Sequence, residues 1–365
     1  MRVSTTRPVR GLLPAILVAI SVVVPAVPGS TQTALPLVGF EGSRDGTHTV
    51  VRATDQAGNA VDLNLDAEQF LSINGGHVAF TRHHEKVTFA SDVIVKDATT
   101  GERIWKVLDA RYPLIFGGGD EMVFLPDNNG RDVPEDRDAY VNSVWYRDLV
   151  SGQDTKLVQF EDPDRQATGF AVSPAGDRVA VTYGNDYFLY VWDIWVLATD
   201  GSSAGPITTD GMSLYPSFSP DGQTIAFTHS DPADACDASV HLMDADGANP
   251  RVLTAGTCDM NLLRPVWLDD QTIVAWKWAQ QPGGWSKPVG LVTISADTGE
   301  ILDQIASGFI VDFVVARDAG QVIFRRLKGR IVAYDTATGV SATVPGGKEL
   351  PGWHLHAEGS LELAI

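Results

Sequence analysis

A nine-residue pattern recurs along this 365-residue chain and constrains its fold more than any other feature. Each copy has a polar or glycine-containing turn, followed by a segment that ends in three apolar residues such as VAF, IAF or VAW. The last residues of successive copies are between 41 (324 to 365) and 57 (124 to 181) residues apart, which is near the period of a four-stranded repeat unit. The seven copies occupy 72–80, 116–124, 173–181, 219–227, 268–276, 316–324 and 357–365.

A second pattern alternates with the first. It is a short apolar strand, a turn with a glycine, and another strand, as at 92–107, 143–158 and 239–254. Two hairpins per unit make a four-stranded antiparallel blade, so the sequence predicts an all-β fold, a single seven-bladed β-propeller over 35–365. Two unrelated β-sandwiches are the alternative, but they require no such alternation. The turn glycines are Gly58, Gly101, Gly152, Gly201, Gly247, Gly299 and Gly339.

The two ends of the repeat region carry half-units. The chain has a lone second half at 48–65 and a lone first half at 351–365. We therefore expect the N-terminal and C-terminal strands to pair in one sheet, each end contributing half of the closing blade. Such pairing would cover sheet edges that otherwise favour aggregation.

The N-terminus resembles a targeting segment. Residues 1–10 are basic, and 11–27 are uncharged and apolar, which is typical of a secretory signal peptide over 1–29. Cleavage after Ala26 or after Gly29 satisfies the small-residue rule, and the window of expected cleavage is 26–34. An uncleaved N-terminal anchor is the alternative. The expected location is extracytoplasmic, either secreted or in the cell envelope.

Charge and cysteine content exclude several classes of protein. With 27 basic against 46 acidic residues the net charge is −19, which disfavours nucleic acid and anionic membrane surfaces as partners. No transmembrane domain is expected in the mature protein. The two cysteines, Cys236 and Cys258, are too few for a thiolate zinc cluster. The blade pattern places both on one face, so in an exported chain we expect a disulfide, with two buried thiols as the alternative.

The long connections of the predicted propeller gather on one face, which is the candidate binding surface. Trp278 and Trp285 lie there as candidate anchors for a sugar or a protein, whereas Trp276 fills a core position. Asp231 and Asp234 belong to an acidic loop on the same face. We expect that loop to be exposed to solvent, and calcium binding is the alternative.

Histidines give a weaker signal. His354 and His356 alternate along a predicted inner strand and are candidate metal ligands there. His229 and His241 have no partner that spacing identifies. No cofactor is expected, with calcium or manganese as the alternatives.

Two segments carry a family resemblance. The stretch 215–227 followed by 240–254, with 168–181 as a further copy, resembles the repeat of the TolB-type, WD-like propellers. That resemblance implies an exported interaction module, a propeller domain of a serine peptidase, or a polysaccharide lyase. The sequence has no GxSxG elbow and no α/β-hydrolase region after the last repeat, so the peptidase interpretation lacks its catalytic half.

The expected function is that of an exported, non-catalytic, monomeric propeller that binds a protein or a cell-envelope glycan on its loop face. A metal-dependent polysaccharide lyase, or another carbohydrate-active enzyme of propeller fold, is the alternative. The acid-rich loops count against a lyase, because uronate sites need basic residues. A calcium-binding scaffold is the third hypothesis.

Overall fold

A computed structural model provides the structure. It describes residues 37–42, 49–54, 60–62, 69–83, 91–98, 100–126, 142–162, 165–185, 191–231, 238–280, 286–327, 330–343 and 356–357. The chain divides into two compact units, Met1–Thr33 and Ala34–Ile365, and all described residues belong to the second. The expected signal peptide lies outside them. Within the described ranges no helix is long and apolar enough to span a membrane.

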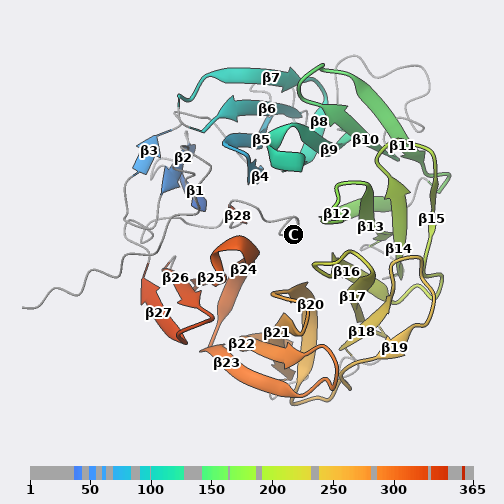
Figure 1. Ribbon diagram of the computed structural model, residues 1–365, viewed down its shortest axis with the longest axis vertical. Helices are drawn as coiled ribbons and strands as arrows, with labels where there is room; N and C mark the ends of the chain where they lie inside the picture. Colours follow the sequence, from blue (N-terminus) through green and yellow to red (C-terminus); the bar gives the residue numbers. More distant parts are fainter. Residues whose placement is uncertain are drawn as a thin grey trace, which may run out of the picture. The chain divides into compact units, whose positions relative to one another are not determined.

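Six sheets of the second unit are each built from four consecutive antiparallel strands (Figure 1). The first three are β4 (Gln69–Asn74), β5 (His77–His83), β6 (Ser91–Asp97) and β7 (Arg103–Val107); β8 (Ala110–Phe116), β9 (Glu121–Pro126), β10 (Ser143–Asp148) and β11 (Asp154–Gln159); and β12 (Gln166–Val172), β13 (Arg178–Asn185), β14 (Val191–Ala198) and β15 (Ala204–Pro206). The next three are β16 (Ser213–Phe218), β17 (Thr224–His229), β18 (Ser239–Asp244) and β19 (Arg251–Val252); β20 (Asn261–Trp267), β21 (Thr272–Gln280), β22 (Ser286–Ser295) and β23 (Ile301–Ser307); and β24 (Ile310–Ala316), β25 (Gln321–Arg326), β26 (Ile331–Asp335) and β27 (Val340–Thr343). Two 3₁₀ turns, η1 (Gly117–Gly119) and η2 (Arg317–Ala319), join β8 to β9 and β24 to β25.

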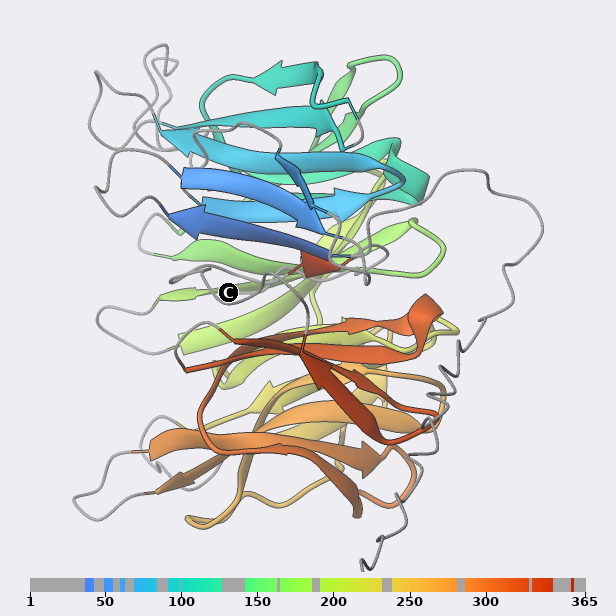
Figure 2. The same cartoon turned by 90° about the vertical axis from the view of Figure 1, so that its left-hand side faces the viewer.

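A further sheet draws strands from both ends of the repeat region. Its order is β28 (His356–Ala357), β1 (Leu37–Gly42), β2 (Thr49–Thr54) and β3 (Ala60–Asp62). The inner strands contact one another in a closed cycle, β4 to β8, β12, β16, β20, β24, β28 and back to β4. Viewed from the side, successive sheets of this unit run alongside one another (Figure 2).

The structure corrects the expectation of a single seven-bladed propeller closed by one half-blade from each end. Six blades, not seven, are built from consecutive strands, and the composite sheet takes three strands from the N-terminal side and one from the C-terminal side. The strand that pairs with β28 is β1, through Leu37 with Ala357 and Val38 with His356, and not a strand of 48–65. The sequence reasoning missed β1 because its segment, LVGFEG, lies outside both repeat patterns. Of the seventh copy, 357–365, only Ala357 lies in a described strand.

The apolar triplets of the repeat form the cores between neighbouring sheets. Val78, Ala79 and Phe80 of β5 are almost completely buried, and so are Ile225, Ala226 and Phe227 of β17. Alternate residues of one strand face opposite neighbours, since strand side chains point to the two sides in turn. Thus Phe227 packs in one cluster with β13 and β14 residues, whereas Ala226 packs in another with β20 to β22 residues. Burial on both sides of each sheet is the source of the apolar runs in the sequence.

Each inner strand of the six consecutive-strand sheets has an irregular register with its neighbour. Backbone with positive φ marks four of these bulges, at Tyr112 (53°), Gly169 (60°), Tyr215 (55°) and Arg264 (50°). A bulge leaves one residue outside the ladder and re-aims its side chain. Bulges recur at the same end of the inner strands, where the long connections also lie.

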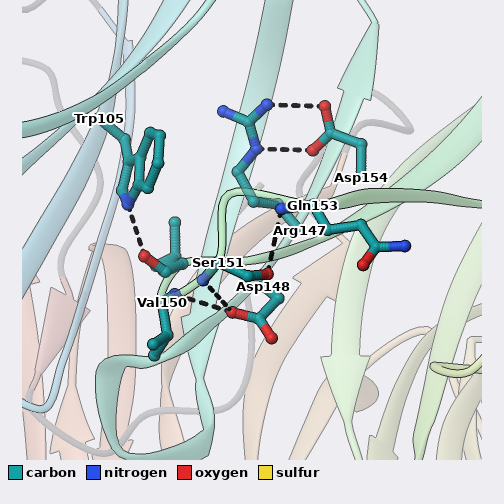
Figure 3. A network of polar contacts seen from close by, with 8 residues as sticks. Trp105, Arg147, Asp148, Val150, Ser151, Gln153 and Asp154 are labelled. Carbon is teal, nitrogen blue, oxygen red and sulfur yellow. Dashed lines mark hydrogen bonds and ion pairs between the residues drawn. The ribbon is translucent and has the colours of Figure 1, made fainter.

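The opposite end carries the short turns, as the glycine pattern predicted. In the β10–β11 turn, the Asp148 carboxylate accepts hydrogen bonds from the amides of Val150 and Ser151, both at 2.8 Å (Figure 3). These amide donors, that of Ser151 first, lower the pKa of Asp148. Trp105 of the preceding sheet donates its indole N–H to the carbonyl of Leu149 at 2.6 Å. The polar groups of this turn are therefore used to stabilise the turn itself.

Candidate functional site

The loop face is defined here as the end of the sheets where the second strand of each sheet stops and the first and third strands begin. Antiparallel order places there both the connections within each sheet, such as 230–238, and the connections between sheets, such as 253–260. Polar side chains are buried at this end in several sheets, including Thr81, Asp92, Asn185, Thr228 and Asp312. The turn face buries fewer of them. Buried polar side chains among the described residues are therefore concentrated at the loop face.

An ion pair is buried between two neighbouring inner strands at this face. Nη1 of Arg264, in the β20 bulge, lies 2.7 Å from Oδ1 of Asp312 in β24, and the two residues are 6% and 2% exposed. The backbone amide of Arg264 donates to the Thr228 hydroxyl at 2.9 Å, and the amide of Phe313 donates to Asp312 at 2.8 Å. The positive φ of Arg264 is thus held by bonds to the preceding sheet. The local fold aims the guanidinium at Asp312.

A second guanidinium shares this carboxylate's neighbourhood. Arg325 of β25 is the register partner of Asp312 and is 6% exposed. Burial lowers the pKa of Arg325, while the negative charge of Asp312 acts in the opposite direction. The Nε–H of Arg325 is buried and has no hydrogen-bond partner. Asp312 is therefore paired with one buried guanidinium, that of Arg264, and lies next to a second, that of Arg325.

Two tryptophans of β21 extend the cluster toward the loop end. Trp276 and Trp278 lie edge to face with ring centroids 6.0 Å apart, and both are half-buried. The Arg264 guanidinium lies 5.7 Å from the Trp276 ring centroid, and the Phe313 ring lies 5.9 Å from it. We call Arg264, Trp276 and Trp278 the arginine–tryptophan cluster. Trp276 packs where the sheets β20–β23 and β24–β27 face each other, beside Phe313 and Phe324. Arg325 follows Phe324 in β25 and therefore faces the opposite side of its sheet.

A second polar group lies on the β16–β19 sheet. The rings of His229 and His241 stack with centroids 4.7 Å apart and planes 12° from parallel. Nε2 of His229 is 3.5 Å from Oδ2 of Asp210, and Nε2 of His241 is 3.1 Å from the Ser239 hydroxyl. Sequence spacing missed this pair because the two histidines lie on adjacent strands, joined only by the β17–β18 register. Ser239 is only 4% exposed, so it is poorly placed to attack a substrate.

The predicted site residues are placed as follows. Trp278 belongs to the cluster, and Asp231 follows β17 at the loop face. Cys258 lies in the connection from β19 to β20, as expected, and its carbonyl accepts the amide of Gln280 at 2.8 Å. His356 begins β28, and nothing is described of its side chain. Trp285, Asp234, Cys236 and His354 lie outside the described residues, so the disulfide and the histidine pair stay predictions.

Sequence reasoning did not identify Arg264, Asp312 or Arg325. The signal that could have found them is a charged residue inside an otherwise apolar strand, as in NLLRPVW (261–267) and IVDFVVA (310–316). Trp276 was expected in the core, and it does pack against the buried cluster that contains Phe313. Across the described part of the chain, no group of three or more His, Cys, Asp or Glu side chains is placed to hold a metal ion.

The sequence matches no protein-family model and no curated protein. Solved structures do match. An oligogalacturonate lyase in complex with manganese is 12% identical, with a TM-score of 0.61 over 85% of this chain and 84% of that one. The β-propeller domain of the Trilobed protease from Pyrococcus furiosus is 15% identical, with a TM-score of 0.59 over 86% and 92% of the two chains.

TolB from Acinetobacter baumannii is a more distant match, 16% identical over 75% of this chain, with a TM-score of 0.45. The likenesses to the lyase and to the Trilobed protease domain support the propeller fold and no more of the resemblance read from the repeat. At these identities a likeness defines the fold alone. Function must come from the site.

Proposed function

We propose that this chain is a non-catalytic propeller that binds a cell-envelope glycan at the loop face, on the arginine–tryptophan cluster. The observation that carries the proposal is the pair of half-buried tryptophans, Trp276 and Trp278, set edge to face beside a buried guanidinium. Aromatic rings offer a large apolar surface with a polar N–H, which suits the faces and hydroxyls of a sugar. Export through the N-terminal segment would bring the protein to such a ligand.

The experiment is a calorimetric titration with defined oligosaccharides. Trp278→Ala should weaken binding about 5- to 100-fold, the range for an interface anchor. Trp278→Phe, which keeps a ring, should lose less. Leu302→Ala is the matched control, because Leu302 lies on the outer strand of the same sheet and is 56% exposed. Equal affinities for Trp278→Ala and the control would exclude the tryptophan pair as the site.

A metal-dependent polysaccharide lyase is the second candidate, and the fold likeness to the manganese-bound oligogalacturonate lyase favours it. The described residues hold no suitable ligand group, and the candidate histidine pair, His354 and His356, cannot be tested on them. We derive no catalytic step. Incubation with manganese and polygalacturonate tests this candidate, because a lyase releases unsaturated uronides that absorb in the ultraviolet. Chelator-sensitive release would replace the non-catalytic proposal.

A further inference from the structure

The orientation of the tryptophan pair depends on packing and not on hydrogen bonds. Nε1 of Trp276 and Nε1 of Trp278 are buried, and neither has a hydrogen-bond partner in the described part of the chain. The Trp276 ring packs edge to face on Trp278 and on Phe313, whose centroids are 6.0 and 5.9 Å away. The Arg264 guanidinium lies over the ring, 5.7 Å from its centroid. Any group that places Arg264 therefore helps to place Trp276.

Arg264 is itself fixed by residues of both neighbouring sheets. Its Nη1 bonds Asp312 of β24 at 2.7 Å, and its guanidinium lies 4.9 Å from the Phe313 ring centroid. Its backbone amide donates to the hydroxyl of Thr228 in β17 at 2.9 Å. One sheet therefore holds the side chain of Arg264, and the other holds its backbone.

The bond to Thr228 is made at the bulge of β20. That bulge begins after Leu263, the register partner of Trp276. Arg264 has a φ of 50° there, which is unfavourable for a residue with a side chain and persists where surrounding contacts hold it. Thr228 is completely buried, so water does not reach its hydroxyl. Loss of this hydroxyl would leave the Arg264 amide without its acceptor and loosen the bulge beside Trp276.

We propose that Thr228 is a positioning residue of the glycan site. Through the Arg264 amide it holds the bulge, and the Arg264 guanidinium in turn holds the tryptophan pair in the arrangement that binds a sugar. This inference rests on the proposed function and adds to the site a residue of another sheet. Rings that are already placed lose less conformational freedom on binding, so the affinity depends on this support.

The preceding sheet offers a matched control. Thr182 of β13 is 2% exposed, and its hydroxyl accepts from the amide of Tyr215 at 3.2 Å. Tyr215 lies in the bulge of β16 with a φ of 55°, in a different sheet from the tryptophan pair. Thr228→Val and Thr182→Val remove the same kind of bond, so we expect similar losses of melting temperature. Only the first acts on the sheet that carries Trp276 and Trp278.

Calorimetry measures the effect on binding. The full chain is titrated with triacetylchitotriose, cellotriose, maltotriose and trigalacturonate, and the variants are titrated with the tightest binder. Thr228→Val should weaken binding about 3- to 10-fold, which corresponds to one hydrogen bond, and Thr182→Val less than about 2-fold. Thr228→Ser, which keeps the hydroxyl, should bind nearly as tightly as the parent chain.

The tryptophan pair also provides a readout that needs no ligand. Its ring planes are 84° apart at a centroid distance of 6.0 Å, so the two indoles couple in the far-ultraviolet circular dichroism. The difference between the parent chain and Trp278→Phe defines that band. Thr228→Val should reduce it, and Thr182→Val should leave it unchanged. Thermal unfolding confirms that each variant is folded.

Arg264→Lys tests the same route should Thr228→Val not fold. It keeps a positive charge for Asp312 but removes the planar guanidinium from the face of Trp276. We expect it to weaken binding at least as much as Thr228→Val. Unchanged affinity would exclude the route through Arg264.

The outcomes separate this inference from the proposed function. Equal affinities of Thr228→Val and Thr182→Val, with binding lost in Trp278→Ala, would exclude Thr228 as a positioning residue and leave the glycan proposal standing. An affinity loss that Thr228→Ser does not restore would also overturn the inference, because the hydroxyl would not be its cause. Binding of no trisaccharide by the parent chain would overturn both proposals.

Discussion

At the scale of single residues, this propeller buries charged groups inside otherwise apolar strands. The Asp312 carboxylate accepts hydrogen bonds from the Arg264 guanidinium and from the amide of Phe313. Arg264 itself has a positive φ. Removing one partner of such a pair leaves an uncompensated buried charge. The energetic consequence can be measured against a pair that solvent reaches.

Asp312→Asn should lower the free energy of unfolding by about 3–5 kcal/mol, because both guanidiniums then lose their anion. Asp154→Asn is the matched control, since Asp154 pairs with Arg147 at 2.6 Å but is 32% exposed (Figure 3). Its loss should cost less than about 1 kcal/mol. Urea unfolding measures both, and equal costs would show that the Arg264–Asp312 pair is not desolvated in solution.

Tyr183 gives a prediction for alkaline pH. Burial raises its pKa to about 12, its ring stacks on Phe160 at 3.9 Å, and its hydroxyl donates to the Asp162 carbonyl at 2.9 Å. The unfolded chain releases this proton near pH 10, before the folded one, so the free energy of unfolding falls as pH rises from about 10 to 12. Tyr183→Phe removes this contribution. Denaturant unfolding across that range should give a shallower decline for the variant, and parallel declines would contradict it.

At the scale of elements, bulges interrupt the inner strands near the loop face. The bulges bring Tyr112, Tyr215 and Arg264 into left-handed backbone, which costs a side-chain-bearing residue about 1–2 kcal/mol. At the equivalent bulge of β12 the residue is Gly169, with a φ of 60°. Glycine removes the cost there.

Gly169→Ala should therefore destabilise the protein by about 1–2 kcal/mol. Gly205→Ala in β15 is the matched control, because Gly205 lacks a positive φ and an added Cβ would meet nothing within 4 Å. That change should be neutral or slightly stabilising. Thermal unfolding of the two variants compares them, and equal melting temperatures would refute a strained bulge at 169.

The sequence repeat predicted the strands and hairpins but not the bulges. The turn glycines and apolar triplets are local signals, so the six hairpins built on 72–80 to 316–324 could be located from sequence. The bulges are not local. They depend on bonds to a neighbouring sheet, such as that from the Arg264 amide to Thr228 of the preceding sheet, and no spacing reveals them. The same holds for the stacking of His229 on His241.

At the scale of the whole unit, closure depends on very few residues. β28 has two residues and pairs with β1 at two positions, yet it also contacts β24 and β4 and so completes the cycle of inner strands. Sequence predicted closure through the two ends but not its division, because β1 carries no repeat signature. Ending the chain at residue 355 removes β28. It should lower the free energy of unfolding by several kcal/mol, measured by denaturant unfolding, and an unchanged value would show that the cycle does not need this strand.

The disulfide is a prediction at the same scale. Cys258 lies beside the end of β21, the strand that carries Trp278, and a bond to Cys236 would tie two loop-face connections together. Mass spectrometry of exported, unreduced protein should find the two cysteines linked. Two thiols open to alkylation in the native protein would exclude the bond.

The central claim is that the loop face binds a glycan on the pair Trp276 and Trp278. A crystal structure of the full chain grown with an oligosaccharide that binds in the calorimetric titrations tests it most directly. The predicted result is a sugar ring in contact with Trp278. An oligosaccharide bound on the turn face, or on the loop face away from these two residues, would contradict it.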